Sequence, residues 1–142
     1  MPEEPQELAA NEWGTIAHYP QWNTLELTWS PNTRSMGDDG FRETLQLLAD
    51  QGLKVRPRFM IIDATQFFHT LAQGTLAWRD ENIVPEYNEA GVQKFAFLAS
   101  EATPGTVEKG GRPAPDGPAT FPTAWFETRD RLYAWLTSGD AA

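Results

Sequence analysis

Few side chains in this sequence of 142 residues could do acid–base chemistry at neutral pH. Histidine is the side chain best suited to it, and the chain has two, His18 and His69. We expect His18 on the surface of a strand, whereas His69 follows two phenylalanines where a strand gives way to a helix. A residue at such a turn can line a pocket. A hydrogen-bonded structural role is the alternative for His69.

Asp63 is the carboxylate that we single out beside His69. It ends Arg58–Asp63, an apolar run without polar alternation, which is typical of a central strand covered on both faces. Open α/β sheets bind ligands beyond the carboxyl ends of their strands, so Asp63 could act there as a general base or accept a hydrogen bond. It could equally cap the turn after the strand by bonding to backbone N–H groups.

Other chemistries are excluded by composition or by spacing. The chain has no cysteine, which rules out disulfides, thiolate metal sites, iron–sulfur clusters and cysteine nucleophiles. The two histidines do not form a pair at metal-ligand spacing, so a metal site would need distant carboxylates, and no phosphate loop, dinucleotide fingerprint or nucleophile elbow is present. We therefore expect neither a metal nor a cofactor.

The balance of charge narrows the class of partner. Asp and Glu outnumber Lys and Arg 20 to 11, and the resulting net charge of −9 argues against nucleic acid and anionic membranes. Four of the glutamates lie in residues 1–12, so we predict an acidic flexible tail there and a folded body of net charge −5 (−9 plus 4). That milder charge weakens the exclusion of nucleic acid. With no signal peptide and no apolar run long enough to cross a bilayer, we expect a cytoplasmic protein without membrane contact.

Apolar periodicity predicts the elements that must position these residues. Thr15–Tyr19 and Leu25–Trp29 are predicted to form an antiparallel hairpin. A helix is predicted over Asp38–Gln51, with a capping box at Ser35–Asp38 and a C-terminal cap at Gly52. The central strand described above comes next.

A second helix is expected after the central strand. Thr70 begins a capping-box pattern, Pro85 must kink or interrupt the helix, and Gly91 ends it. The strand Val92–Leu98 follows.

The last third of the chain has a different composition. Residues 100–122 are rich in proline and glycine and are expected to form a long loop. A short strand at Ala124–Phe126 and a helix capped by Thr128 and reaching Thr137 come next, and residues 138–142 form a C-terminal tail.

Residues 13–137 should therefore form one α/β domain whose mixed sheet has a central parallel part, with the elements in the order ββαβαββα. Several short motifs support a family resemblance: Ile61–Ala64, Trp78 with Ile83–Pro85 and Glu89–Gly91, and the closing segment Trp125–Leu136. In these motifs and in element order the chain resembles the STAS fold of the sporulation anti-sigma-factor antagonists, and in particular bacterial relatives described as SpoIIAA-like or STAS/CRAL-TRIO-like proteins. The resemblance runs from Ile16 to Leu136 and implies the same sandwich of sheet and helices.

The resemblance also implies a switch that this sequence does not carry in its usual form. The antagonists have an Asp-Ser-Ser-Gly run whose serine, at a helix N-terminus, is phosphorylated by a partner kinase. Phe67–Leu71 stands in the comparable place here and lacks this run. Thr70 could take the place of the serine, because a helix N-terminus favours a phosphate, or it could act as a helix cap alone.

The six tryptophans fall into two groups. Three lie on apolar strands or on a helix stripe and are expected in the core: Trp29, Trp125 and Trp135. Three others are harder to bury, and exposed aromatics can mark a partner surface or a ligand groove: Trp13, Trp22 and Trp78. A helix kinked at Pro85 could open a groove beside Trp78.

These observations lead to two hypotheses of function. The first is a non-catalytic binding or regulatory module that engages an unknown protein partner or a small apolar ligand near Asp63, His69, Thr70 and Trp78. The alternative is a small enzyme that uses Asp63 and His69 as an acid–base pair under residues 100–122 as a mobile lid. Placement of these two side chains on opposite sides of the sheet would exclude the pair. Self-association into a homodimer is compatible with the first hypothesis.

Overall fold

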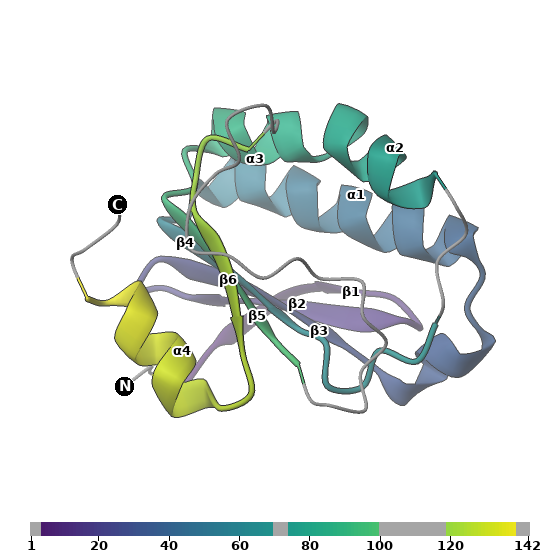
Figure 1. Cartoon of the computed structure of the whole chain (residues 1–142), viewed down its shortest axis with the longest axis horizontal. Coiled ribbons are helices and arrows are strands. Elements are labelled where there is room, and N and C mark those ends of the chain that lie inside the picture. Colours follow the sequence, from purple (N-terminus) through teal and green to yellow (C-terminus); the bar gives the residue numbers. More distant parts are fainter. Residues whose placement is uncertain (1–3, 70–73, 100–118, 139–142) are drawn as a thin grey trace.

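The computed structural model describes residues 4–69, 74–99 and 119–138, which form a six-stranded sheet with helices on both faces (Figure 1). Along the chain the elements are β1 Gln6–Ala10, β2 Gly14–Tyr19, β3 Thr24–Trp29, the 3-10 helix η1 Pro31–Ser35, α1 Asp38–Val55, β4 Phe59–Asp63, α2 Thr75–Asn82, α3 Val84–Ala90, β5 Lys94–Leu98, β6 Thr123–Phe126 and α4 Arg129–Leu136.

The strands lie in the sheet in chain order, from β1 at one edge to β6 at the other. The strands β1, β2 and β3 pair antiparallel, whereas β3, β4, β5 and β6 pair parallel. The predicted α/β class, with a mixed sheet and a parallel central part, is therefore confirmed.

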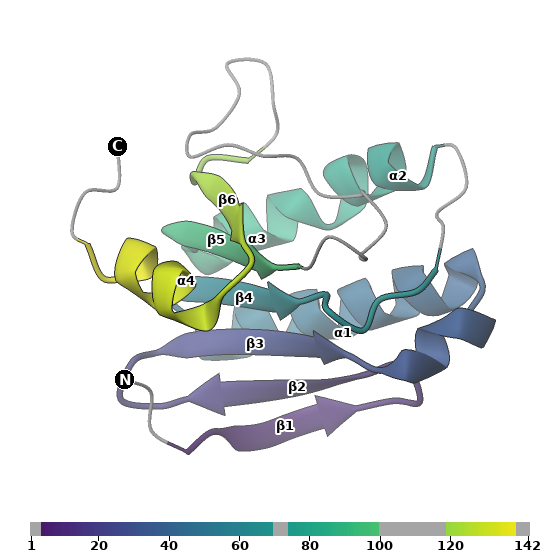
Figure 2. The ribbon, with the colours of Figure 1, turned by 60° about the horizontal axis from the view of Figure 1, so that its bottom comes forward.

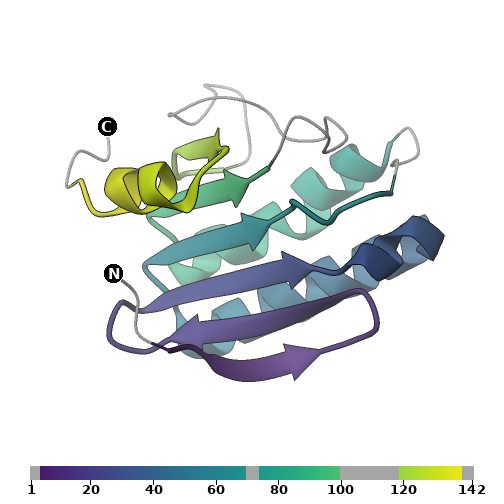
Figure 3. The same cartoon turned by 90° about the horizontal axis from the view of Figure 1, so that it is seen from below.

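The helices divide between the two faces of the sheet. The crossovers through α1 and through α2 and α3 advance in the same direction across the sheet, so right-handed connections place all three helices on one face (Figure 2). The last helix, α4, packs on the other face against β5 and β6, and strands β1–β3 have no described helix on that side (Figure 3). No helix in the described part of the chain has the length and apolar character needed to cross a membrane.

Strand β4 separates two cores, which explains its run of apolar residues. Met60 and Ile62 belong to the larger core, under α1 and α3, while Phe59 and Ile61 belong to the smaller core under α4. All five positions of β4 are buried. The prediction of a central strand covered on both faces is confirmed.

The predicted flexible tail over residues 1–12 is wrong for residues 6–10. This segment forms β1, which pairs antiparallel with β2, for example Gln6 with His18 and Ala10 with Thr15. It is an edge strand, and Ala9 is its one residue that is not exposed. Its glutamate can therefore remain in solvent while the backbone pairs, because an edge strand needs few apolar side chains.

The predicted caps of the first helix are also wrong. Ser35 lies in η1, where its hydroxyl donates to the carbonyl oxygen of Asn32, and Gly37 is the N-cap of α1 without a side-chain hydrogen bond. The helix continues past Gly52 to Val55, and Arg56 takes the left-handed position after it. Gly52 instead permits close packing, since a Cβ there would lie 2.6 Å from the Met60 side chain.

The predicted interruption near Pro85 is confirmed. The helical segment breaks at Ile83, and Pro85 lies in the first turn of α3, where its missing N–H costs nothing. Gly91 ends α3 with a φ of 88°, as expected for a C-terminal glycine. Thr128 caps α4 by accepting from the N–H of Arg131, also as predicted.

Candidate functional site

His69 lies at the edge of the sheet formed by the carboxyl ends of the parallel strands. Its Nε2 is 2.5 Å from Oδ1 of Asp38, the first residue of α1. The hydroxyl of Thr75, the first residue of α2, donates to the other oxygen of the same carboxylate. Asp38 therefore ties the segment after β4 to the N-termini of two helices, where a negative charge is favourable.

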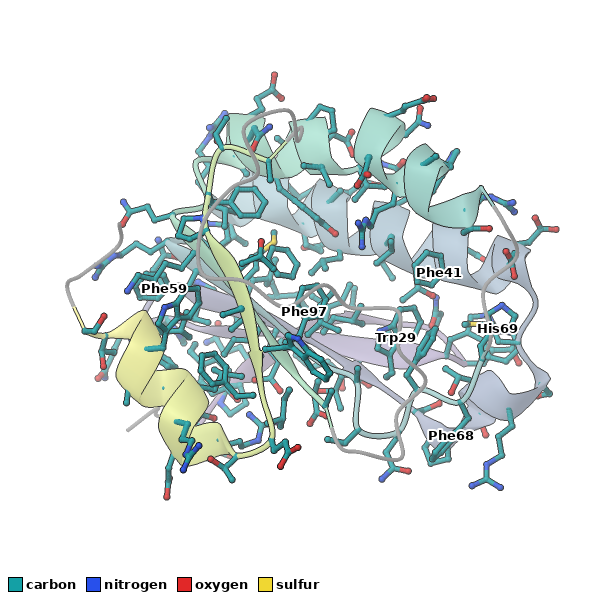
Figure 4. All side chains as sticks on the ribbon, viewed as in Figure 1. Trp29, Phe41, Phe59, Phe68, His69 and Phe97 are labelled. Atoms are coloured by element: carbon teal, nitrogen blue, oxygen red, sulfur yellow. The ribbon has the colours of Figure 1, made fainter. Side chains whose placement is uncertain are left out.

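Two arginine–aromatic contacts involve rings close in sequence to the residues that bond Asp38: Phe68 precedes His69, and Trp78 lies one turn after Thr75 in α2. The guanidinium carbon of Arg34 lies 4.4 Å from the ring centroid of Phe68, and that of Arg42 lies 5.9 Å from Trp78. Figure 4 shows Phe68 and His69 at the same end of the molecule. We call the set of five residues the aromatic–arginine patch: Arg34, Arg42, Phe68, His69 and Trp78.

The chain before His69 is held by the core and by a buried hydroxyl. The ring of Phe67 packs 4.9 Å from that of Trp29 and 6.0 Å from that of Phe41. The hydroxyl of Thr33, in η1, accepts the N–H of Phe68 at 2.9 Å and lies 2.9 Å from the carbonyl oxygen of Gln66. Because Phe67 occupies the core, the two residues after it reach the surface in a defined orientation.

Asp63 belongs to a different cluster, on the face of the sheet that carries α4. Arg129 Nη2 lies 2.8 Å from a carboxylate oxygen of Asp63 and 2.8 Å from one of Glu26. Thr65 donates its N–H at 3.1 Å and its hydroxyl at 2.6 Å to the other oxygen of Asp63. The turn-capping interpretation of Asp63 is therefore confirmed, and an ion pair with α4 is added to it.

The same cluster shifts the pKa of two of its members. The hydrogen bond from Arg129 to Glu26 raises the pKa of the guanidinium, although burial opposes this change. Burial, with the nearby Glu26 charge, raises the pKa of the Tyr19 hydroxyl. Arg129 is therefore a fixed cation, and Tyr19 stays protonated as a donor to Glu26 at 3.3 Å.

The structure does not bring Asp63 and His69 together. Asp63 points to the α4 face and pairs with Arg129, whereas His69 pairs with Asp38 at the start of α1, which covers the opposite face. The predicted Asp63–His69 acid–base pair is therefore not formed. Thr70 lies outside the described residues.

The division of the tryptophans into core and surface groups is only partly correct. Trp29 is buried, as predicted, with 3% of its surface exposed. The other five are half-buried, including two that were expected in the core: Trp13, Trp22, Trp78, Trp125 and Trp135. Trp125 lies on the edge strand β6 and Trp135 on α4, which packs against β5 and β6.

Asp38, Arg34 and Arg42 were not singled out from the sequence as site residues. One signal was available for two of them: Asp38 and Arg42 are four positions apart and therefore lie on one side of the first helix. The side chains that Asp38 and Arg42 contact, His69 and Trp78, come after the central strand in the sequence. Nothing in the sequence indicates that the segment after this strand packs against the start of α1.

Within the three described segments, no group of three His, Cys, Asp or Glu side chains could hold a metal ion. No protein-family model, curated protein or solved structure significantly matches the chain.

Proposed function

We propose that the chain is a non-catalytic binding module that engages a protein partner through the aromatic–arginine patch. One observation carries the proposal: the guanidinium groups of Arg34 and Arg42 lie over two half-buried aromatic rings, and the segments that carry these rings are linked through Asp38. Arginine and aromatic side chains are enriched in protein interfaces and supply much of their binding energy. A protein partner is favoured over a small apolar ligand because a charged guanidinium group already lies over each of the two aromatic rings.

The proposal includes a STAS-like fold and a cytoplasmic location. After the edge strand β1, the strands and α-helices run ββαβααββα, which is the expected order ββαβαββα with its second helix divided into α2 and α3. Two residues of the patch, Phe68 and His69, lie between β4 and α2. In the resemblance described above, that segment is where the antagonists meet their partner kinase. Element order supports the fold alone.

The acid–base alternative has less support, because each of its two residues is engaged elsewhere. Asp63 is held by Arg129 and Thr65, and His69 by Asp38. These contacts hold Asp63 and His69 with different partners, so the two side chains do not form the pair that this alternative requires.

Site-specific photocrosslinking in the native cells tests the proposal. A benzophenone amino acid replaces Phe68 in one variant and Leu8, the exposed residue of β1, in the control. We expect a discrete crosslinked protein from position 68 and not from position 8. The same crosslink should weaken when Arg34→Ala and Trp78→Ala are added.

The proposal fails if position 68 gives no discrete product, or if both positions give the same products. A product of twice the mass of the chain would show that the partner is a second copy. Thermal melting of each variant must show that it is folded before its crosslinks are compared.

A further inference from the structure

A basic segment lies at the end of the molecule opposite the aromatic–arginine patch. Lys54, Arg56 and Arg58 fill three of the five positions 54–58 between the last turn of α1 and the start of β4, and all three are exposed. The whole chain has 11 Lys and Arg against 20 Asp and Glu, so this concentration of positive charge is unusual within it. Figure 4 shows Phe59, the next residue, at the other end of the molecule from Phe68.

The three charges of the basic segment have no carboxylate partner among the residues that the structure describes. No Asp or Glu in the described part of the chain lies within ion-pair distance of them. By contrast, Arg42, Arg79 and Arg129 each pair with an acidic side chain at 3.0 Å or less. The segment therefore presents cations that an external anion can reach.

The backbone of the basic segment is held in a defined conformation. The N–H of Arg56 donates to Gly52 at 2.7 Å, the side chain of Asn23 donates to the carbonyl of Arg56 at 3.1 Å, and the N–H of Arg58 donates to Asn23 at 2.8 Å. Arg56 and Asn23 have φ values of 54° and 47°, a left-handed conformation that glycine would adopt at lower cost. A preorganised loop loses less entropy when a partner binds.

Helix capping accounts for only part of this arrangement. Lys54 lies in the last turn of α1, and Arg56 Nη1 donates at 2.9 Å to the carbonyl of Glu89 near the end of α3, where the helix dipole favours cations. Arg58 is at no helix end, and its guanidinium carbon lies 4.6 Å from the centroid of the Phe59 ring. Capping therefore does not explain why three exposed cations occur together.

The occupant that fits this surface is an acidic stretch of polypeptide. A nucleic acid or an anionic bilayer presents an extended negative field, which a chain of net charge −9 repels. A few neighbouring carboxylates can instead contact the basic segment alone. We propose that residues 54–58 bind an acidic segment of a partner protein. This surface is separate from the aromatic–arginine patch, so either proposal can fail without the other.

The test uses the full chain and a short fluorescein-labelled polyglutamate peptide, with binding followed by fluorescence anisotropy at low and at physiological salt. The variant Lys54→Gln with Arg58→Gln removes two charges and leaves the bond from Arg56 to Glu89 intact. The control, Arg79→Gln with Arg131→Gln, removes the same charge elsewhere. We expect salt-dependent binding that the first variant weakens about tenfold and the control less than about twofold.

Three results would overturn the proposal. One is the absence of binding to the wild-type chain at low salt. Another is an equal loss in both double variants, which would show an effect of net charge alone. The third is tighter binding to duplex DNA, or to vesicles of phosphatidylserine and phosphatidylcholine, than to the peptide. Thermal melting must show that both variants are folded.

Discussion

Replacing Arg129 by methionine removes the cation that joins α4 to the sheet. In the native structure its guanidinium donates at 2.8 Å to Glu26 and at 2.8 Å to Asp63. Glu26 is 4% exposed, so its charge would remain in a poorly solvated position without a counterion. Methionine keeps much of the side-chain length, which confines the perturbation to charge and hydrogen bonding.

The expected loss of stability follows from these contacts. Breaking a buried ion pair by removing one partner costs about 3–5 kcal/mol. Two features reduce this figure: the Arg129 side chain is 36% exposed, and each carboxylate keeps at least one other hydroxyl donor. We therefore expect the Arg129→Met variant to lose about 2–3 kcal/mol in free energy of unfolding.

Urea unfolding at neutral pH measures this loss, with the slope against denaturant compared between variants. The control is Arg131→Met, which changes an exposed arginine two positions along α4 and should shift stability by less than about 0.5 kcal/mol. Adding Glu26→Gln to Arg129→Met should recover part of the loss, because it neutralises the charge left unpaired. A loss no larger than that of the control would refute the claim that this cluster anchors α4.

Three further predictions concern single positions. Tyr87→Phe should leave stability at neutral pH unchanged or raise it by about 1 kcal/mol, because the buried hydroxyl has no partner among the described residues. Burial raises the pKa of Tyr87 above 10.0, so the unfolded chain loses the hydroxyl proton first and stability falls as the pH rises above that value. Denaturation measured below and above pH 10.0 should show a smaller fall in stability for the variant. Gly40→Ala should lower stability by about 1–3 kcal/mol despite a better helix propensity, since its Cβ would lie 2.7 Å from the Trp13 ring nitrogen and 2.6 Å from the Met36 side chain. Thermal melting measures this loss, and the control is Gly37→Ala, because the space around Gly37 is open. Thr33→Val should cost about 1–3 kcal/mol by leaving the N–H of Phe68 without its acceptor, and should speed amide exchange there.

The sequence predicted correctly those elements whose residue types depend on which faces of the element are buried. Strand β4 and the break near Pro85 are examples. A strand buried on both faces needs a run of apolar residues, and proline lacks the N–H that a continuous helix needs. The strand β1 left no such signature. Its backbone pairs with β2 while its side chains stay in solvent, so its composition is that of a tail.

The candidate site stays a prediction, to which the structure adds the contacts that link two of its segments. Asp38 bonds both His69 and Thr75, and Thr75 lies one turn before Trp78 in α2. Asp63 does not belong with them. Its role as a turn cap was one of the two alternatives that its position at the end of a strand left open, and hydrogen bonding to Thr65 decides between them.

By itself, the sequence determined which chemistry the chain can hold and the order of its elements from β2 onward: no thiol, two histidines, and strands alternating with helices after a hairpin. Only the tertiary structure decided the partners of the ionisable groups. Asp63 meets Arg129, 66 positions away, and His69 meets Asp38, 31 positions away. The physical reason is that successive side chains of a strand point to opposite faces of the sheet. Which helix covers each face depends on the hand of the crossovers and on where α4 packs. Neither of these is written in local spacing.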